Sequence, residues 1–237
     1  MKYHHEYSQY FLQDKNFVSE LIGHSNIRKR DHVIDIGAGS GIISASLSKK
    51  AGRVTAIEYE KDAVMKLQQH MQRYQNVEVI QTDFMNYTLP TTPYKIFANI
   101  PFHLSSPILT RLTESPNPPR SIYLIVQKQF ARKLLVERDD TFKSMLGTKI
   151  GPLYAAKIKR PLRKTDFWPH PNVDTVLLEL KLRETPLLPT EQLAAYRTFV
   201  ERAYTDIEFF RAKISDDTAK PSHTLLESWI RLANQHL

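Results

Sequence analysis

The sequence has 237 residues, a hydrophobic fraction of 41% and a formal net charge of +8, which together predict a globular chain with a polyanionic partner. It contains no cysteine, which excludes a disulfide scaffold, a thiol nucleophile and a Cys-ligated zinc, and its histidines lack the spacing of a metal site. Because no apolar run can span a bilayer and none follows residues 1–6, we expect no membrane partner, no secretory signal and a cytoplasmic location.

The first elements of the chain predict a nucleotide-binding loop. Asp14 can cap a first helix, and a buried-strand pattern at 32–36 runs directly into Gly37-Ala38-Gly39-Ser40-Gly41 before a helix at 42–50. The glycine spacing is compressed relative to Gly-x-Gly-x-x-Gly, and no Lys-Ser/Thr follows as in a phosphate-binding loop. An adenosine ligand without phosphate, S-adenosylmethionine (AdoMet), therefore fits better than a dinucleotide.

Two further strands end in acidic residues that suit this ligand. The strand at 53–57 ends at Glu58, which can accept hydrogen bonds from both ribose hydroxyls, although a helix cap or a solvated carboxylate is the alternative. A helix at 61–73 and a strand at 77–80 precede Asp83 and Phe84. Asp83 can accept an adenine amino proton while Phe84 packs on the ring, but an Asp after a strand is often only a turn residue.

The most informative stretch is Asn99-Ile100-Pro101-Phe102, directly after a strand at 95–98. Pro101 cannot continue the strand, so Asn99 should lie at the carboxyl end of the sheet, where open α/β folds bind ligands. The Asn99 side-chain oxygen and the Ile100 carbonyl can accept the two N–H bonds of an exocyclic amine, and Phe102 can stack on the base. The alternative is a strand-to-helix turn with a buried Phe.

The remaining elements complete the fold prediction. Helices at 105–112 and 129–137 and strands at 122–126, 153–158 and 173–182 complete an α/β sheet of about seven strands. Together with the AdoMet-type glycine loop and the amine-binding stretch at 99–102, this sheet predicts a Rossmann-like fold of the AdoMet-dependent methyltransferase kind. From residue 185 onward the pattern is helical. We therefore predict an AdoMet-binding catalytic domain at 1–184 and a small all-helical C-terminal domain at 185–237.

Basic residues are concentrated between positions 128 and 164, where eleven Lys and Arg face only three acidic residues. This pattern favours phosphate contacts with a nucleic acid, and a solvated charged face is the alternative. The predicted RNA-binding residues are Lys128, Arg132, Lys133, Arg160, Arg163 and Lys164.

Taken together, these motifs resemble those of a known family. The order Ser-Gln-x-Phe-Leu, Asp-Ile-Gly-Ala-Gly-Ser-Gly, Ile-Glu, Asp83, Asn-Ile-Pro-Phe and Phe-x-Pro-x-Pro-x-Val-x-Thr resembles the rRNA adenine N6-methyltransferases over residues 6–183. Phe102 favours the Erm type, which acts on 23S rRNA and confers macrolide–lincosamide–streptogramin B resistance, over the small-subunit enzymes, which usually carry Leu and Tyr around the same proline.

The resemblance implies roles for individual residues. Gln9, Leu12 and the backbone of Tyr10 would border the methionine end of AdoMet, and Gly37 would allow its close approach. The ribose would bind Glu58. The resemblance likewise assigns the adenine to Asp83 and Phe84, and the target base to Asn99, Ile100 and Phe102. The family usually has Asn at the position of Tyr10. This chain therefore departs from the family pattern at the residue that would contact the methionine end of AdoMet.

We therefore expect a monomeric enzyme that transfers a methyl group from AdoMet to N6 of an adenine in 23S rRNA. Three alternatives remain open: a 16S rRNA adenine dimethyltransferase, a non-catalytic RNA-binding or ribosome-assembly factor on the same fold, and a methyltransferase acting on a protein amide.

Overall fold

The computed structural model describes residues 10–237, so Gln9 lies outside the described residues. The chain folds into two compact units. The first contains the residues up to Lys128 together with Ile158–Glu179, and the second contains Gln129–Lys157 and Leu180–Leu237. Each unit is described by itself below.

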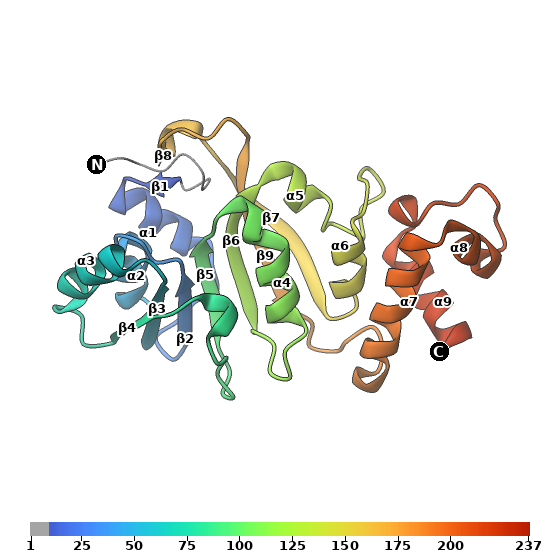
Figure 1. Ribbon diagram of the computed structural model, residues 1–237, viewed down its shortest axis with the longest axis horizontal. Helices are drawn as coiled ribbons and strands as arrows, with labels where there is room; N and C mark the ends of the chain where they lie inside the picture. Colours follow the sequence, from blue (N-terminus) through green and yellow to red (C-terminus); the bar gives the residue numbers. More distant parts are fainter. Residues whose placement is uncertain (1–9) are drawn as a thin grey trace. The chain divides into compact units, whose positions relative to one another are not determined.

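A seven-stranded sheet forms the main framework, with the strand order β4-β3-β2-β5-β6-β9-β7 (Figure 1). Its strands are β2 (His32–Ile36), β3 (Arg53–Glu58), β4 (Val77–Gln81), β5 (Lys95–Asn99), β6 (Ser121–Gln127), β7 (Tyr154–Leu162) and β9 (Thr175–Leu182). From β4 to β6 all neighbouring strands pair in parallel. The chain runs from β2 outward to β4 and returns to β5 on the other side of β2, so the strand order reverses between β2 and β5. Open α/β sheets bind ligands at such a point.

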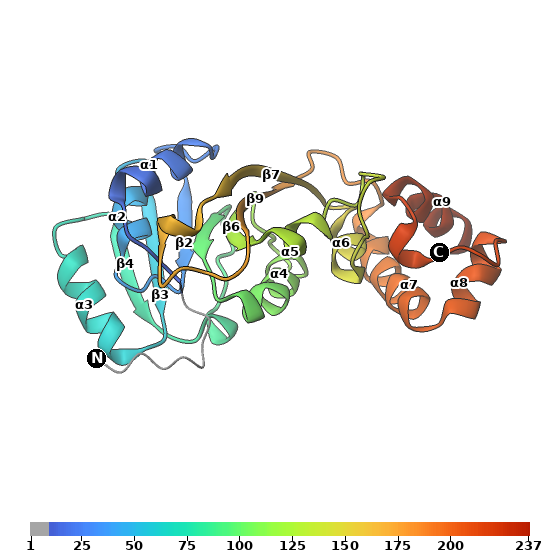
Figure 2. The ribbon, with the colours of Figure 1, turned by 90° about the horizontal axis from the view of Figure 1, so that it is seen from above.

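Helices cover both faces of this sheet, as the continuous apolar strand sequences require. Figure 2 shows α1 (Lys15–Gly23) and α2 (Ile42–Ser48) on one side of the strands and α4 (Ser105–Thr113) on the other. The helix α3 (Lys61–Met71) follows β3 and buries Leu67 and Met71. The predicted cap of the first helix is confirmed, because the Asp14 side chain accepts a hydrogen bond from the Asn16 backbone N–H at 2.7 Å.

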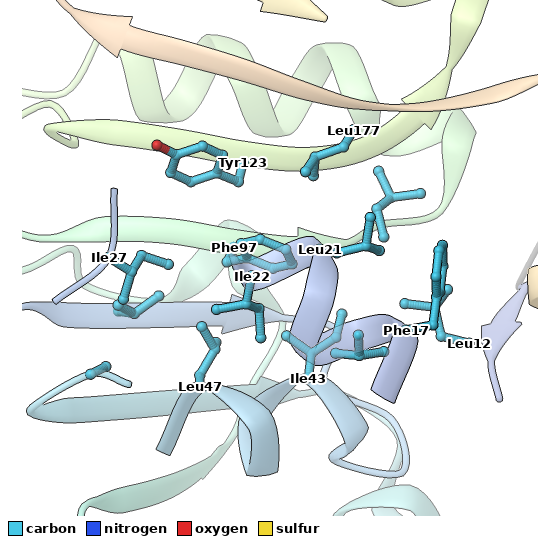
Figure 3. Packing of buried hydrophobic residues seen from close by; sticks show 14 of the residues in the cluster. Leu12, Phe17, Leu21, Ile22, Ile27, Ile43, Leu47, Phe97, Tyr123 and Leu177 are labelled. Carbon is cyan, nitrogen blue, oxygen red and sulfur yellow. The ribbon is translucent and has the colours of Figure 1, made fainter. Parts of the chain in front are cut away.

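The core of the first unit lies between α1, α2 and the sheet (Figure 3). Leu21 of α1 and Leu47 of α2 are fully buried there, and Phe97 of β5 stacks on Tyr123 of β6 with ring centroids 5.9 Å apart. Burying side chains of this size stabilises a fold by about 1.5–3 kcal/mol each. This packing fixes the strand ends that carry the candidate site residues.

A second, two-stranded sheet joins segments that are far apart in the sequence. The strand β1 (Phe11–Leu12) pairs antiparallel with β8 (Phe167–Trp168), with Phe11 opposite Trp168 and Leu12 opposite Phe167. Figure 1 shows the two strands side by side. Leu12 and Phe167 are buried in the same core cluster as α1.

The second unit is built mainly from helices. These are α6 (Met145–Ile150), α7 (Leu193–Thr205), α8 (Ile207–Ile214) and α9 (Leu226–His236). The fully buried Trp229 packs against Phe199, Tyr204 and Phe210, with ring centroids 5.1–6.2 Å apart. The predicted Rossmann-like sheet of about seven strands and the helical C-terminal region are both confirmed.

Two details differ from the sequence-based expectation. The helix predicted at 129–137 is only the short α5 (Lys128–Arg132). Its continuation is stopped because the Lys133 carbonyl accepts hydrogen bonds from the backbone and the hydroxyl of Ser144, at 2.8 and 3.1 Å. The compact units also do not follow the predicted boundary at 184, because β7 and β9 each run from one unit into the other. The functional division at 184 therefore stays a prediction.

Candidate active site

The glycine loop lies at the carboxyl end of β2. Gly37 has a φ of +68°, in the left-handed region that favours glycine, and its backbone N–H donates to the Ile57 carbonyl at 2.9 Å. A Cβ placed on Gly37 would meet no atom within 4 Å. The loop therefore leaves open space where the backbone can approach a ligand closely.

Glu58 holds this loop in place. One carboxylate oxygen accepts the Gly39 backbone N–H at 2.8 Å, and the other accepts the backbone N–H groups of Tyr59 and Glu60 at 2.8 and 3.0 Å. Three backbone N–H donors therefore orient the carboxylate beside the glycine loop. An ionised carboxylate has about four acceptor positions, so it can also accept from a ligand hydroxyl.

Asp83 and Phe84 follow β4. The Asp83 side chain accepts a hydrogen bond from the Met85 backbone N–H at 2.9 Å and caps the short helix Phe84–Asn86. Asp83 therefore has the structural role of a turn residue, which was the alternative to adenine binding. Phe84 is buried, and the Arg111 guanidinium lies 5.1 Å from its ring centroid while donating to its carbonyl. These contacts fix both residues where they border the cavity described below.

Asn99 is the last residue of β5, and its carboxamide has a defined orientation. Its side-chain nitrogen donates to the Tyr10 carbonyl at 2.6 Å. Since a backbone carbonyl only accepts hydrogen bonds, the atom facing it must be the NH₂ group. The side-chain oxygen is then directed away from Tyr10, and it is the atom that could accept a hydrogen bond from an amine N–H.

The segment after Asn99 turns sharply at Pro101. The Ile100 side chain is buried, and Phe102 begins a short helical turn, Phe102–Leu104. The Phe102 ring is only half-buried, and it packs against the Tyr10 ring with centroids 5.3 Å apart and planes inclined by 33°. Phe102 is therefore not the fully buried residue that the alternative interpretation required.

All of these residues line one cavity of about 380 Å³ in the first unit. This volume lies within the usual range for small-molecule and cofactor sites. The predicted site residues that border it are Tyr10, Leu12, Gly37, Glu58, Asp83, Phe84, Asn99, Ile100 and Phe102. The structure thus brings together the predicted catalytic and cofactor-binding residues that fall within residues 10–237.

Sequence reasoning missed a buried ionisable group in β2, the strand that leads into the glycine loop. Asp35 in the middle of β2 is fully buried, and one of its oxygens accepts the Ser44 hydroxyl at 2.7 Å. Its other oxygen has no hydrogen-bond partner among residues 10–237. Burial, and secondarily the charge of Glu58, raise the pKa of Asp35 to about 7 against the Ser44 hydrogen bond. The signal in the sequence was a lone Asp within an apolar strand.

The predicted RNA-binding residues divide between the two units. Arg160 contacts Glu20 and lies over the Phe17 ring, 5.3 Å from its centroid, so part of its charge is used within the fold. Arg163 is exposed beside Asp166, and Lys164 donates to the Asn172 carbonyl at 3.1 Å. Lys128 lies 3.7 Å from Asp174. Arg132 and Lys133 lie at the end of α5 and just after it.

Residues 10–237 lack two features that would point to other functions. They contain no group of three or more His, Cys, Asp or Glu side chains arranged to hold a metal ion. None of their helices is both long and apolar enough to cross a membrane.

Comparison with known proteins identifies relatives over most of the chain. The family model described as "Ribosomal RNA adenine dimethylase" matches residues 1–208. The small-subunit methyltransferase A of Streptococcus equi subsp. zooepidemicus is 29% identical over 194 residues, 78% of this chain and 67% of that protein. The protein of the same name from Lactococcus lactis is 26% identical over 235 residues, 93% of this chain and 80% of that protein. The chain thus spans about two thirds of the first relative's length.

Solved structures support the fold. The 23S rRNA methyltransferase ErmE has a TM-score of 0.81 at 24% identity, covering 95% of this chain and 98% of that one. A dimethyladenosine transferase from Plasmodium falciparum has a TM-score of 0.76 at 18% identity, covering 94% and 95%. These likenesses confirm the methyltransferase fold. Since the family model covers most of the sequence, the chain belongs to the ribosomal RNA adenine dimethylase family, whose methyl donor is AdoMet.

Proposed function

We propose that this chain transfers a methyl group from AdoMet to N6 of an adenine in 23S rRNA. The observation that carries the chemistry is the tethered Asn99 carboxamide, whose nitrogen is held by the Tyr10 carbonyl at 2.6 Å. The tether presents the side-chain oxygen as a fixed hydrogen-bond acceptor at the edge of the cavity.

The residues around the cavity fit AdoMet. Gly37 lets the protein backbone approach the ligand closely, and the oriented Glu58 carboxylate has an acceptor position left for a ribose hydroxyl. Asp83 with Phe84 suits the adenine. Tyr10 and Leu12 border the same cavity and are assigned to the methionine end, whereas Gln9 lies outside the described residues. When bound, AdoMet supplies an electrophilic methyl group carried on a positively charged sulfur.

The protein's part in the reaction is to hold and polarise the target amine. The lone pair of an adenine N6 is delocalised into the ring, so the nitrogen is a poor nucleophile. Hydrogen bonds from N6 to the Asn99 oxygen and the Ile100 carbonyl favour the geometry in which the lone pair faces the methyl group. These dipoles also stabilise the positive charge that develops on nitrogen, and such fixed dipoles are worth a factor of about 10²–10³ in rate. The proton that N6 loses passes to water, so no general base is assigned.

Phe102 is assigned to the target base. Its half-buried ring lies at the cavity beside Asn99, where it can stack on an adenine that has left its helix. Extruding a base costs a few kcal/mol, and stacking of about 1–3 kcal/mol offsets part of that cost.

The assignment to 23S rRNA, and with it macrolide–lincosamide–streptogramin B resistance, rests on the Phe side chain at position 102. Small-subunit (16S) rRNA is the second candidate, and the names of the curated relatives favour it. Mapping reverse-transcription stops on protein-free 16S and 23S rRNA after incubation with AdoMet separates the two. A stop on 16S rRNA alone would refute the 23S assignment, and unchanged macrolide susceptibility of expressing cells would refute the resistance.

Asn99→Ala tests the chemistry. We expect methylation of the rRNA to fall at least about 100-fold, because the polarising acceptor is lost, while AdoMet binding measured by calorimetry remains detectable. Near-normal incorporation of label from tritiated AdoMet would refute the role of Asn99. If the unsubstituted chain binds RNA but no AdoMet, the non-catalytic RNA-binding factor replaces the enzyme.

A further inference from the structure

Trp168 is an exposed aromatic residue that has no role in the proposed methyl transfer. Its side chain is 58% exposed, whereas Trp229 is fully buried. Scattered exposed apolar residues are common on protein surfaces and need no explanation. Trp168 differs because its strand pairing with Phe11 and its ring contact with His170 both fix its position.

The pairing of β1 with β8 determines which way the indole points. Residues directly opposite each other in an antiparallel pair extend to the same face of the ladder. Trp168 is opposite Phe11, whereas Leu12 and Phe167 form the adjacent pair and are buried on the other face. Phe11 lines the cavity, and its ring comes within 3.7 Å of the Cβ position of Gly39. Trp168 therefore lies on the same face of the ladder as Phe11, the residue that lines the cavity.

The indole is also held by its own loop. The His170 ring meets it edge to face, with centroids 5.5 Å apart and an interplanar angle of 86°. His170 Nδ1 lies 3.0 Å from the Lys164 carbonyl and 2.8 Å from the Phe167 carbonyl. Because carbonyl oxygens only accept, Nδ1 carries the proton, and the ring orientation is set by the loop itself. A pre-positioned aromatic loses little entropy when it binds a partner.

Positive charge flanks the indole on the same loop. The Arg163 side chain is 79% exposed, and its partner Asp166 is nearly buried. Lys164 reaches back to the Asn172 carbonyl and is also exposed. An exposed aromatic ring that follows two exposed cations on the same segment matches the chemistry of a single-stranded nucleic acid, in which a base stacks and the adjoining phosphates meet positive charge.

We propose that Trp168 is a stacking platform for an unpaired nucleotide of the RNA substrate, next to the adenine that enters the cavity, with Arg163 and Lys164 at the adjoining phosphates. The inference deepens the proposed function and rests on RNA being the substrate. It names the substrate class as RNA that is single-stranded beside the target, because a base within a duplex has no free face for the indole.

Tryptophan fluorescence tests stacking without requiring methylation. The emission of Trp168 is taken as the difference between the unsubstituted chain and Trp168→Phe, so the buried Trp229 cancels. We expect single-stranded oligoadenylate to quench this emission and an RNA duplex of the same length to leave it unchanged. Equal quenching by both RNAs, or quenching by neither, would overturn the proposal.

Binding and kinetics provide the second test. We expect Trp168→Ala to raise the dissociation constant for single-stranded RNA about 5- to 100-fold, Trp168→Phe to restore most of the affinity, and AdoMet binding to stay unchanged. The matched control is Phe142→Ala, since Phe142 is 64% exposed and also meets a histidine edge to face, His223 at 4.7 Å. An equal loss of RNA affinity in the Phe142 and Trp168 variants would refute the platform.

The two proposals fail in different ways. If the oligonucleotide quenches Trp168 but neither rRNA is methylated, the platform stands and the methylation proposal falls. If Trp168→Ala binds RNA and methylates rRNA normally, the platform falls and the methylation proposal stands.

Discussion

Replacing Asp35 by Asn should make the chain more stable at alkaline pH. Asp35 is fully buried in β2, and one of its oxygens has no hydrogen-bond partner among residues 10–237. Desolvation raises its pKa from 3.8 to about 7. A carboxyl whose pKa is higher in the folded state binds its proton more tightly there. The contribution of Asp35 to the unfolding free energy is therefore largest below pH 4, and it falls as the pH rises through the unfolded pKa toward the folded one.

The size of the effect follows from the gap between the two pKa values. One pKa unit corresponds to 1.36 kcal/mol, so this single group lowers the unfolding free energy by about 4 kcal/mol between pH 4 and pH 8, and by about 3 kcal/mol between pH 5 and pH 8. Asp35→Asn keeps the shape and an oxygen acceptor for the Ser44 hydroxyl at 2.7 Å, but it does not ionise. Its stability relative to the unsubstituted chain should rise by about 3 kcal/mol over that interval.

Urea unfolding followed by circular dichroism at pH 5 and pH 8 measures this difference. The effect of Asp35 is the difference between the two chains at each pH, in which the other titrating groups cancel. Ser44→Ala is the matched control, since removing its hydrogen bond should raise the pKa of Asp35 further and shift the pH dependence upward. If the unsubstituted chain and Asp35→Asn lose stability in parallel from pH 5 to pH 8, the carboxyl does not titrate in the folded state as argued.

Two further predictions concern ligand binding. Glu58→Gln should weaken AdoMet binding about 10- to 100-fold by calorimetry, because the new NH₂ group would face a backbone N–H donor of the loop. Glu78→Gln is the control, since the Glu78 side chain is exposed on β4. Equal AdoMet affinities of the two variants would contradict the role of Glu58. Arg163→Ala combined with Lys164→Ala should lower the slope of log affinity for RNA against log salt by about 2, and an unchanged slope would return this loop to a solvated charged face.

The sequence was sufficient for the parts of the site that depend on local pattern. Gly37, Glu58, Asp83 and Asn99 each follow a recognisable strand, and parallel strands end at one edge of the sheet. Their convergence on one cavity was therefore predictable from strand order alone. The roles assigned to them remain predictions until the variants are measured.

The features that escaped prediction depend on contacts between distant segments. The pairing of Phe11 with Trp168 joins two short strands that no periodicity reveals. Arg160 looked like a free cation in the sequence, yet Glu20 and Phe17 engage it in the fold. The early end of the helix after Arg132 likewise depends on where the chain returns, at Ser144.

Tyr10 stands where the family usually has Asn, and its contact with Asn99 is made by its backbone and not by its side chain. This difference raised the question of how the amino-terminal segment contacts the site. Toward Asn99 the contribution of position 10 is its backbone carbonyl, which any residue supplies equally. The side chain is then free to differ, and the Tyr10 ring packs against Phe102 at 5.3 Å. The same short segment continues into Phe11 opposite Trp168, so residues 10–11 connect the Asn99 carboxamide with the proposed RNA platform. A change in the backbone path of β1 should therefore affect both base polarisation and RNA binding, whereas Tyr10→Phe should leave the carboxamide tether intact.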